Sequence, residues 1–149
     1  MISFQVHGTP APKGSPRVVT RGRGGIPLPH PRVLKDSPKT ESWHAQVALQ
    51  AMIAMRGRQM FVGRALRVGI GFRLLRPAGH YRKDGSLKPS APSYPQVKPD
   101  LDKLVRATLD PLIGICFDED SRIVELDSAK TSAPAGQGTG AGITVESWG

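Results

Sequence analysis

The stretch KPDLDKLVRATLDPLIGICFDEDSRIVELDSAK, residues 98–130, decides the fold. From Leu101 onward the apolar residues recur at helical spacing, which predicts a helix with one buried face. Pro111 should distort or end this helix, because it lacks the N–H that an i→i−4 hydrogen bond requires. Gly114 fits a C-terminal cap. A strand is then expected from about 122 to 130, so this stretch predicts a helix followed by a strand.

The flanking sequence predicts the rest of one small domain over residues 1–149. In chain order, the other expected elements are a strand over 2–6, a helix begun by Ser37-Pro38 and continuing to Met55, a strand over 66–74 and a last strand over 143–148. Gly69 and Gly71 share the second face of the 66–74 strand, which suggests a close approach by another element. Basic Pro- and Gly-rich loops are expected at about 8–36 and 76–99. The order predicts an α/β (α+β) fold, with a mixed β-sheet and two main helices packed on it.

The charge of the chain indicates a polyanionic partner. Lys and Arg number 21 against 12 Asp and Glu, a net charge of +9 with a pI near 10.3. Residues 1–99 contain 17 basic and three acidic residues, whereas residues 100–149 contain four basic and nine acidic residues. An excess of this size favours nucleic acid first. The gathering of carboxylates in one short window indicates more than a solvated surface.

Several classes of protein are excluded by motifs that the sequence lacks. No apolar stretch approaches the ~20 residues of a membrane span, and the start has no secretory signal pattern. A single cysteine, Cys116, rules out an internal disulfide or a Cys-based zinc cage, and we expect it to be a buried apolar side chain. Residues 21–25, RGRGG, lack the flanking strand and helix of a phosphate-binding loop, so no nucleotide cofactor is expected. We expect a soluble, cytoplasmic protein.

The acidic residues beside Pro99 form a candidate metal site. The residue before a proline is biased to extended geometry, and in an extended entry Asp100 and Asp102 point the same way. Two such carboxylates suit Mg²⁺ or Mn²⁺. About eighteen residues later, the run 118–120 (DED) can add a third carboxylate. Arg106, four residues after Asp102, lies on the same helical face and could reach a phosphate.

Each of these residues also has a purely structural interpretation. Asp-x-Asp before a helix is often a cap, because negative charge suits a helix N-terminus. Asp110 can pair with Arg106 at i+4. Glu125 and Asp127 alternate on the expected strand and can form an ordinary solvated face. Two acidic clusters on a chain of net charge +9 give the metal site equal weight with the structural interpretation.

The basic loops are candidates for nucleic-acid contact. Tyr81 and Tyr94 could stack on unpaired bases, or could simply pack within the loops. The four histidines are scattered without metal-ligand spacing. The basic loop residues that could track a DNA backbone are Lys13, Arg17, Arg21, Arg23, Arg82, Lys83, Lys88 and Lys98.

The stretch 98–130 resembles the central motif of RusA-type Holliday junction resolvases, which runs K-P-D-x-D-N-x-x-K-x-x-x-D, then D-D-s-q-v-v and a distal lysine. Asp100, Asp102 and Asp110 fall on the first three acidic positions of that motif, Asp120 on the last one, and Lys130 on the distal lysine. Weaker agreement extends to both sides: the first strand with GTPAPK (8–13), the Trp43-His44 helix and the end of the 66–74 strand.

The resemblance implies a crossover junction endodeoxyribonuclease that acts as a homodimer on four-way DNA with Mg²⁺, Mn²⁺ being a substitute. Asp100, Asp102 and Asp120 would bind the metal, and Arg106 would join them in catalysis. It also implies a bacterial cell, with a bacterial or phage gene, and a role in recombination, repair or phage DNA processing. The residues expected to contact DNA are Lys13, Arg17, Lys98, Lys103, Arg106 and Lys130.

The sequence departs from that motif at four positions. Lys103 replaces the usual Asn and Arg106 the usual Lys, while Glu119 stands where Asp is commoner and Pro111 is unusual. Arginine binds phosphate well but cannot shuttle protons, because it is always charged. Two other functions stay open: a nuclease for a flap or fork, since the sequence does not settle the substrate, and a non-catalytic DNA-binding protein whose acidic patch is structural or recruits a partner.

Overall fold

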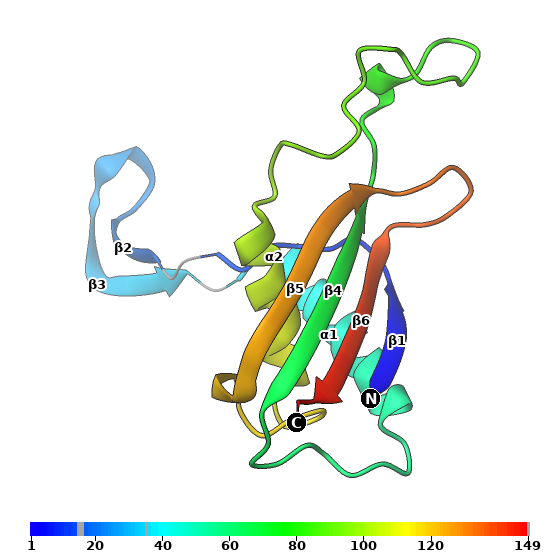
Figure 1. The fold of residues 1–149 in the computed structure, drawn as a ribbon. Coiled ribbons are helices and arrows are strands. Elements are labelled where there is room, and N and C mark those ends of the chain that lie inside the picture. Colours follow the sequence, from blue (N-terminus) through cyan, green and yellow to red (C-terminus); the bar gives the residue numbers. More distant parts are fainter. Residues whose placement is uncertain (15–16, 35, 149) are drawn as a thin grey trace.

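The computed structural model describes residues 1–14, 17–34 and 36–148. None of the helices in these ranges combines the length and apolar character that crossing a membrane requires. The helices and strands are β1 (Ile2–His7), β2 (Arg17–Arg21), β3 (Pro27–Leu34), α1 (Pro38–Ala54), β4 (Leu66–Leu74), α2 (Leu101–Leu109), β5 (Ile123–Ser132) and β6 (Gly140–Ser147) (Figure 1). Four short 3₁₀ turns are η1 (Arg23–Gly25), η2 (Ala78–His80), η3 (Asp110–Leu112) and η4 (Asp120–Arg122).

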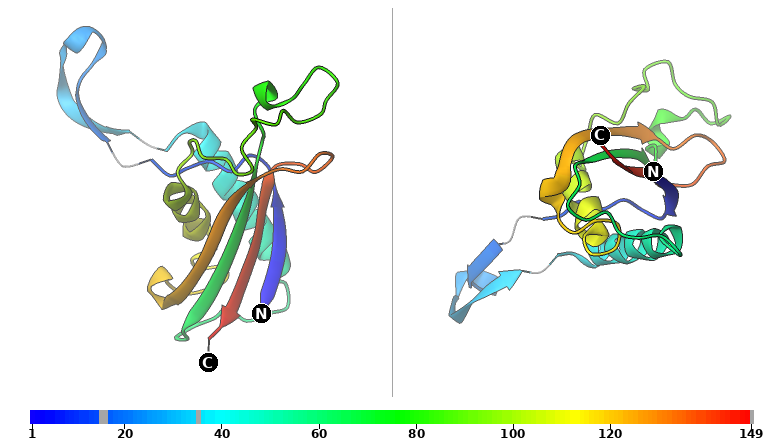
Figure 2. Two further views of the ribbon diagram at one scale, coloured as in Figure 1. Left: turned by 45° about the horizontal axis from the view of Figure 1, so that its top comes forward. Right: turned by 60° about the horizontal axis from the view of Figure 1, so that its bottom comes forward.

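A four-stranded mixed sheet forms the centre of the fold, in the order β1-β6-β4-β5. β5 runs parallel to β4, whereas β6 is antiparallel to both β1 and β4. Alternate side chains of β4 from Leu66 to Leu74 are buried, and α1 and α2 lie on that same side of the sheet (Figure 2). The small α+β domain with two helices on a mixed sheet, expected from the sequence, is confirmed.

Helix α1 begins and packs as its sequence predicts. Ser37 is the N-cap, and its side chain accepts a hydrogen bond from Thr40 N at 3.3 Å, with Pro38 in the first turn. The buried residues of α1 recur every three or four positions, which places one stripe against the sheet. They are Thr40, Trp43, Val47 and Ala51.

Helix α2 starts at Leu101 and stops as an α-helix at Leu109. Pro111 lies in the 3₁₀ turn η3 that follows, which confirms that the proline ends the regular helix. The extended entry is shorter than expected, because Asp100 is the N-cap and Asp102 already lies in the first helical turn. Gly114, at φ 80°, adopts the left-handed conformation that glycine tolerates best.

The two helices are joined by one buried hydrogen bond. Trp43 Nε1 on α1 donates to Thr108 Oγ1 on α2 at 3.0 Å, and that hydroxyl in turn donates to Leu104 O at 2.9 Å. All three residues are buried. A buried N–H without a partner is costly, so this pair fixes how α2 is oriented against α1.

The expectation of a basic Pro- and Gly-rich loop over about 8–36 is wrong for part of that range. β2 and β3 pair as an antiparallel hairpin, with Val18 opposite Val33. The prolines at 27, 29 and 31 removed the usual strand signal from the sequence, but they recur every second residue. Their missing N–H groups can therefore fall on the free edge that a two-stranded hairpin leaves. Residues 76–99 form an irregular segment with the short η2, as expected.

The two glycines of β4 differ in what they face. A Cβ at Gly69 would lie 2.6 Å from Thr144 Oγ1 on β6, so the expected close approach is confirmed there. A Cβ at Gly71 would meet no heavy atom within 4 Å. On the side of the sheet without helices, the strand centre is therefore crowded at one glycine and open at the other.

Replacing Thr108 by Val should destabilise the fold by about 1–3 kcal/mol, because the buried Trp43 indole N–H loses its acceptor without a change of shape. Urea unfolding followed by tryptophan fluorescence measures the free energy. Thr144→Val, the same chemical change at an exposed position of β6, is the control. Equal stability of both variants would contradict the assigned bond.

Cys116 should be inert in the folded protein. It is fully buried, and desolvation raises its pKa from the ordinary value of 9.0 to about 11, so at pH 8 the reactive thiolate is nearly absent. We expect dithiobisnitrobenzoate to titrate one thiol in denaturant and almost none without it. The Cys116 thiol loses its proton at a lower pH in the unfolded chain than in the folded protein. Its ionisation therefore lowers the free energy of unfolding as the pH rises above about 9, and Cys116→Ala should lack this decrease. Rapid labelling of the native protein would overturn the assignment.

Candidate functional site

Asp100 and Asp102 occupy the N-terminal end of α2. Asp100 is the N-cap residue, with φ −68° and ψ 138°, but its side chain makes no capping hydrogen bond. Asp102 lies in the first turn with its side chain exposed. Lys103 Nζ lies 3.4 Å from Asp100 Oδ2. The capping interpretation therefore explains the position of Asp100 but leaves its carboxylate available for another role.

Lys130 fixes the segment that leads into this acidic pair. Its ammonium group donates to Val97 O at 2.7 Å and to Pro99 O at 2.9 Å. Lys130 lies near the end of β5, so these two bonds tie the chain just before Asp100 to the edge of the sheet. Lys98, between the two carbonyls, is exposed. In the free protein, Lys130 thus positions the acidic pair.

Lys13 joins the segment after β1 to α2. Its backbone N–H donates to Lys103 O at 3.1 Å, and its ammonium group forms an ion pair with Asp110. Thr40 on α1 donates to Pro12 O at 2.8 Å, so this segment is held between the two helices. The structure gives Asp110 a different partner from the Arg106 that the sequence suggested. The pairing across 97 residues carries no local sequence signal.

Arg106 lies one helical turn after Asp102 and, like it, is exposed on the outer side of α2. Side chains four residues apart share one face of a helix. The guanidinium group can therefore bind an anion that approaches the acidic pair from solvent. This placement agrees with the sequence-based expectation for Arg106.

The second acidic cluster uses two of its three carboxylates structurally. Arg122 contacts Asp118 Oδ2 at 3.2 Å and Glu119 Oε1 at 2.9 Å, and Gly63 N donates to Asp118 at 3.3 Å. Desolvation acts to raise the pKa of Asp118, but the hydrogen bonds from Arg122 and Gly63 outweigh it and hold that pKa below its usual value. Among the described residues, Asp120 has no ion pair or side-chain hydrogen bond. Asp120 is thus the carboxylate of this cluster left free for a ligand.

Asp120 does not meet the acidic pair within one chain. It lies in η4 immediately before β5, whereas Lys130, seven residues past the first residue of β5, touches Pro99. A strand rises about 3.3 Å per residue, so roughly 23 Å of strand separates the two ends. Over residues 1–14, 17–34 and 36–148, no three His, Cys, Asp or Glu side chains gather closely enough to hold a metal ion. Within the described residues, Asp100 and Asp102 lie two positions apart at the start of α2, Asp102 already in the helix, whereas Asp120 lies before the first residue of β5.

The chemistry of Asp100 and Asp102 fits a hard divalent cation. Mg²⁺ commonly binds one or two carboxylates and completes its octahedron with water and substrate phosphate oxygens. Two carboxylates at a helix N-terminus, neither used for capping, supply such a partial donor set. The nearby Lys103 ammonium offsets their mutual repulsion in the metal-free protein.

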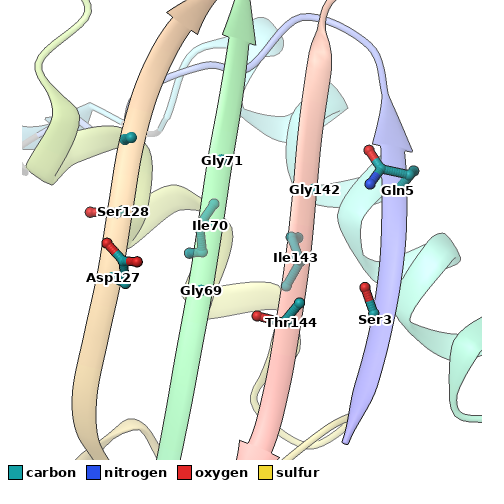
Figure 3. A pocket seen from close by; sticks show the side chains of 11 residues that line it. Ser3, Gln5, Gly69, Ile70, Gly71, Asp127, Ser128, Gly142, Ile143 and Thr144 are labelled. Atoms are coloured by element: carbon teal, nitrogen blue, oxygen red, sulfur yellow. The ribbon is translucent and has the colours of Figure 1, made fainter.

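The hollow on the face of the sheet without helices is a separate feature (Figure 3). It measures about 370 Å³ and is lined by Gly69, Gly71 and Gly142, and of these three only Gly71 has no heavy atom within 4 Å of where a Cβ would lie. Its lining includes Asp127 but none of the residues at the N-terminus of α2. Glu125, on the same strand, pairs with Arg67 at 3.0 Å, which agrees with its structural interpretation. This hollow brings together no acid–base or metal-binding group of residues.

The remaining expected DNA-contact residues lie in different surroundings. Tyr94 is exposed, and Tyr81 forms a bridge with Leu87 in the irregular segment. The side chain of Arg17 lies outside the described part of the chain.

Two features were not predicted from the sequence: the positioning role of Lys130 and the hairpin of β2 and β3. For the hairpin, the available signal was the spacing of prolines at every second residue.

Comparison with known protein families gives a match over nearly the whole chain. The family model described as Endodeoxyribonuclease RusA matches residues 7–146 of 149. The search of curated proteins found no match. The matched region contains both acidic clusters, Arg106, Lys13 and Lys130, in the places described above. The chain belongs to the RusA family of endodeoxyribonucleases.

Proposed function

We propose that this protein is a Mg²⁺-dependent endonuclease that resolves four-way DNA junctions and works as a homodimer. Family membership supplies the endodeoxyribonuclease activity. The observation that carries the metal assignment is Asp100, which sits at the N-cap of α2 without capping it, next to the exposed Asp102. The net charge of +9 supports binding to a polyanion.

The residues at and near the N-terminus of α2 have different roles in the proposed reaction. Asp100 and Asp102 hold the cation, which when bound lowers the pKa of a water molecule and stabilises charge on the phosphate oxygens. Arg106 binds the phosphate from the same side of α2 and neutralises its charge, but it moves no proton because it stays protonated. Lys103, 3.4 Å from Asp100, is the nearby cation that can exchange a proton. Lys130 keeps the segment before Asp100 in place.

A second copy can supply the carboxylate that one chain holds too far away. β5 is an edge strand, and two of its own apolar residues, Val124 and Leu126, are 61% and 45% exposed. A two-fold axis near the middle of β5 would bring Asp120 of the partner subunit to the N-terminal end of α2. The same symmetry produces two matched sites, which is what paired cuts in opposing strands require.

Asp102→Asn should abolish metal-dependent cleavage, by at least about 100-fold, because the amide loses the charge that holds the cation. Binding to a four-way junction in EDTA should persist. Asp127→Asn, an equal change of charge on the sheet face without helices, is the control and should cut normally. Calorimetry with Mn²⁺ provides a readout without DNA. Wild-type cleavage by Asp102→Asn would refute the metal assignment.

The substrate is tested by comparing a four-way junction with a flap, a fork and linear duplex, each with Mg²⁺ or EDTA. The proposal expects paired, Mg²⁺-dependent cuts in opposing strands of the junction alone. Preferential cutting of the flap or fork would establish the alternative nuclease. Tight binding of the junction without any cutting would establish a non-catalytic binding protein.

Mixing two inactive variants tests the shared site. If each site uses Asp102 of one subunit and Asp120 of the other, a heterodimer of Asp102→Asn and Asp120→Asn subunits has both substitutions in one site and neither in the other. Random mixing makes about half of the dimers heterodimers, and each of these should have one intact site. We expect the mixture to nick one strand of the junction while each variant alone is inactive. If every site lies within one chain, mixing restores nothing. Sedimentation should give about twice the 16.0 kDa chain mass.

A further inference from the structure

The hairpin of β2 and β3 projects away from the sheet and its helices (Figures 1 and 2). Its strands pair through Val18 and Val33, and its tip contains Gly24 and Gly25, both with φ near 75°. Glycine adopts this left-handed conformation without strain, so the sequence builds a tight turn at the tip. A two-stranded hairpin by itself is marginally stable in water. We therefore expect this hairpin to pack against the surface of a binding partner.

The charge of the hairpin specifies that surface. Residues 17–34 include four arginines and no acidic residue. The side chains of Arg21, Arg23 and Arg32 are exposed, and Arg21 donates to Gly25 O at 3.3 Å. Among the described residues, none of these three forms an ion pair. Exposed guanidinium groups without carboxylate partners favour a phosphate-rich surface.

Apolar side chains on the hairpin favour binding in a groove of DNA over contact with the phosphate backbone alone. Val18 and Val33, directly opposite each other, are 63% and 65% exposed, and Ile26 at the tip is 67% exposed. The major groove of DNA is about 12 Å wide and admits a two-stranded ribbon, where arginine can reach guanine and phosphate and apolar groups can contact thymine methyls. The ribbon therefore matches this groove in width and chemistry.

The base of the hairpin lies close to the acidic pair. Lys13, near its first strand, bonds to Lys103 O on α2, and α1 begins just after its second strand. The eight residues of β3 span about 26 Å at 3.3 Å per residue, or roughly eight base pairs at 3.4 Å each. A duplex whose phosphate sits at Asp100 and Asp102 is within reach of the hairpin.

We propose that the β2–β3 hairpin is a DNA-binding arm that enters the major groove of a duplex segment beside the cleaved phosphate. Arg21, Arg23 and Arg32 contact phosphates and base edges, and Ile26 lies in the groove. This inference rests on the proposed function in that it requires DNA as the partner. It adds a second contact, several base pairs from the acidic pair.

The arm is tested by replacing Arg21, Arg23 and Arg32 with Gln. The control replaces Arg56, Arg58 and Arg64, three exposed arginines between α1 and β4, so both variants lose the same charge. Fluorescence anisotropy in EDTA measures binding over a range of salt, on junctions with arms of about 20 or about 5 base pairs. The slope of log affinity against log salt should fall by about one per lost contact. This decrease in slope should occur only for the arm variant, and only on the junction with the longer arms.

A probe at the tip tests where the arm lies. Ile26→Cys can be labelled selectively with an iron chelate, because Cys116 is buried. Strand scission should fall within the duplex segment, several base pairs from the site of enzymatic cleavage. Scission confined to the crossover, or none, would overturn the proposed placement. Equal affinity and salt slope for the arm and control variants would overturn it as well.

The outcomes separate this inference from the proposed function. The arm variant keeps Asp100, Asp102 and Arg106, so Mg²⁺-dependent cleavage should remain detectable although its affinity for DNA is lower. If the wild type cuts the junction but the arm variant binds like the control, only the arm inference fails. If the wild type binds through the arm yet cuts nothing, only the nuclease proposal fails. A loss of dimer mass in the arm variant would assign the hairpin to subunit contact and overturn the inference.

Discussion

The hydrogen bond between Trp43 and Thr108 is the interaction on which the placement of α2 depends. Both groups are buried, so neither can exchange its partner for water at low cost. With Thr108 facing inward, Leu104 one turn earlier also faces the core, and Asp102 and Arg106 must face outward. A core contact between helices therefore determines which charged residues the N-terminal turns of α2 present to solvent.

The carboxylates near α2 and η4 differ in whether a basic side chain already pairs with them. Asp110 pairs with Lys13, and Asp118 and Glu119 share Arg122. Asp102 and Asp120 have no such partners among the described residues. A carboxylate held closely by a cationic side chain, as Arg122 holds Glu119 at 2.9 Å, competes poorly for a metal ion, whereas Lys103 lies farther from Asp100, at 3.4 Å. The ion pairs around α2 and η4 thus leave uncommitted two of the three acids that the family resemblance selects.

Local patterns in the sequence predicted most of the fold, because both sheet and helices follow a regular burial period. The alternation over β4 and the helical stripe of α2 each reported one buried face. The hairpin was missed because proline conceals a strand whose outer edge is free. The acidic residues could be identified from the sequence, but the Lys13–Asp110 pair and the two carbonyl bonds of Lys130 join distant segments. No local pattern encodes such pairings.

The length of β5 connects the incomplete acidic site with the incomplete sheet. The strand holds Asp120 at one end and, through Lys130, the acidic pair at the other, so a single chain keeps the free carboxylates a strand length apart. The same strand is the sheet edge with exposed apolar side chains. In the proposed homodimer, a two-fold contact across that edge would cover the apolar surface and bring Asp120 of each subunit to the N-terminal end of α2 in the other. The exposed apolar side chains of β5 and the separation of Asp120 from the acidic pair therefore favour the same dimer. In that arrangement, formation of the dimer would also complete both sites.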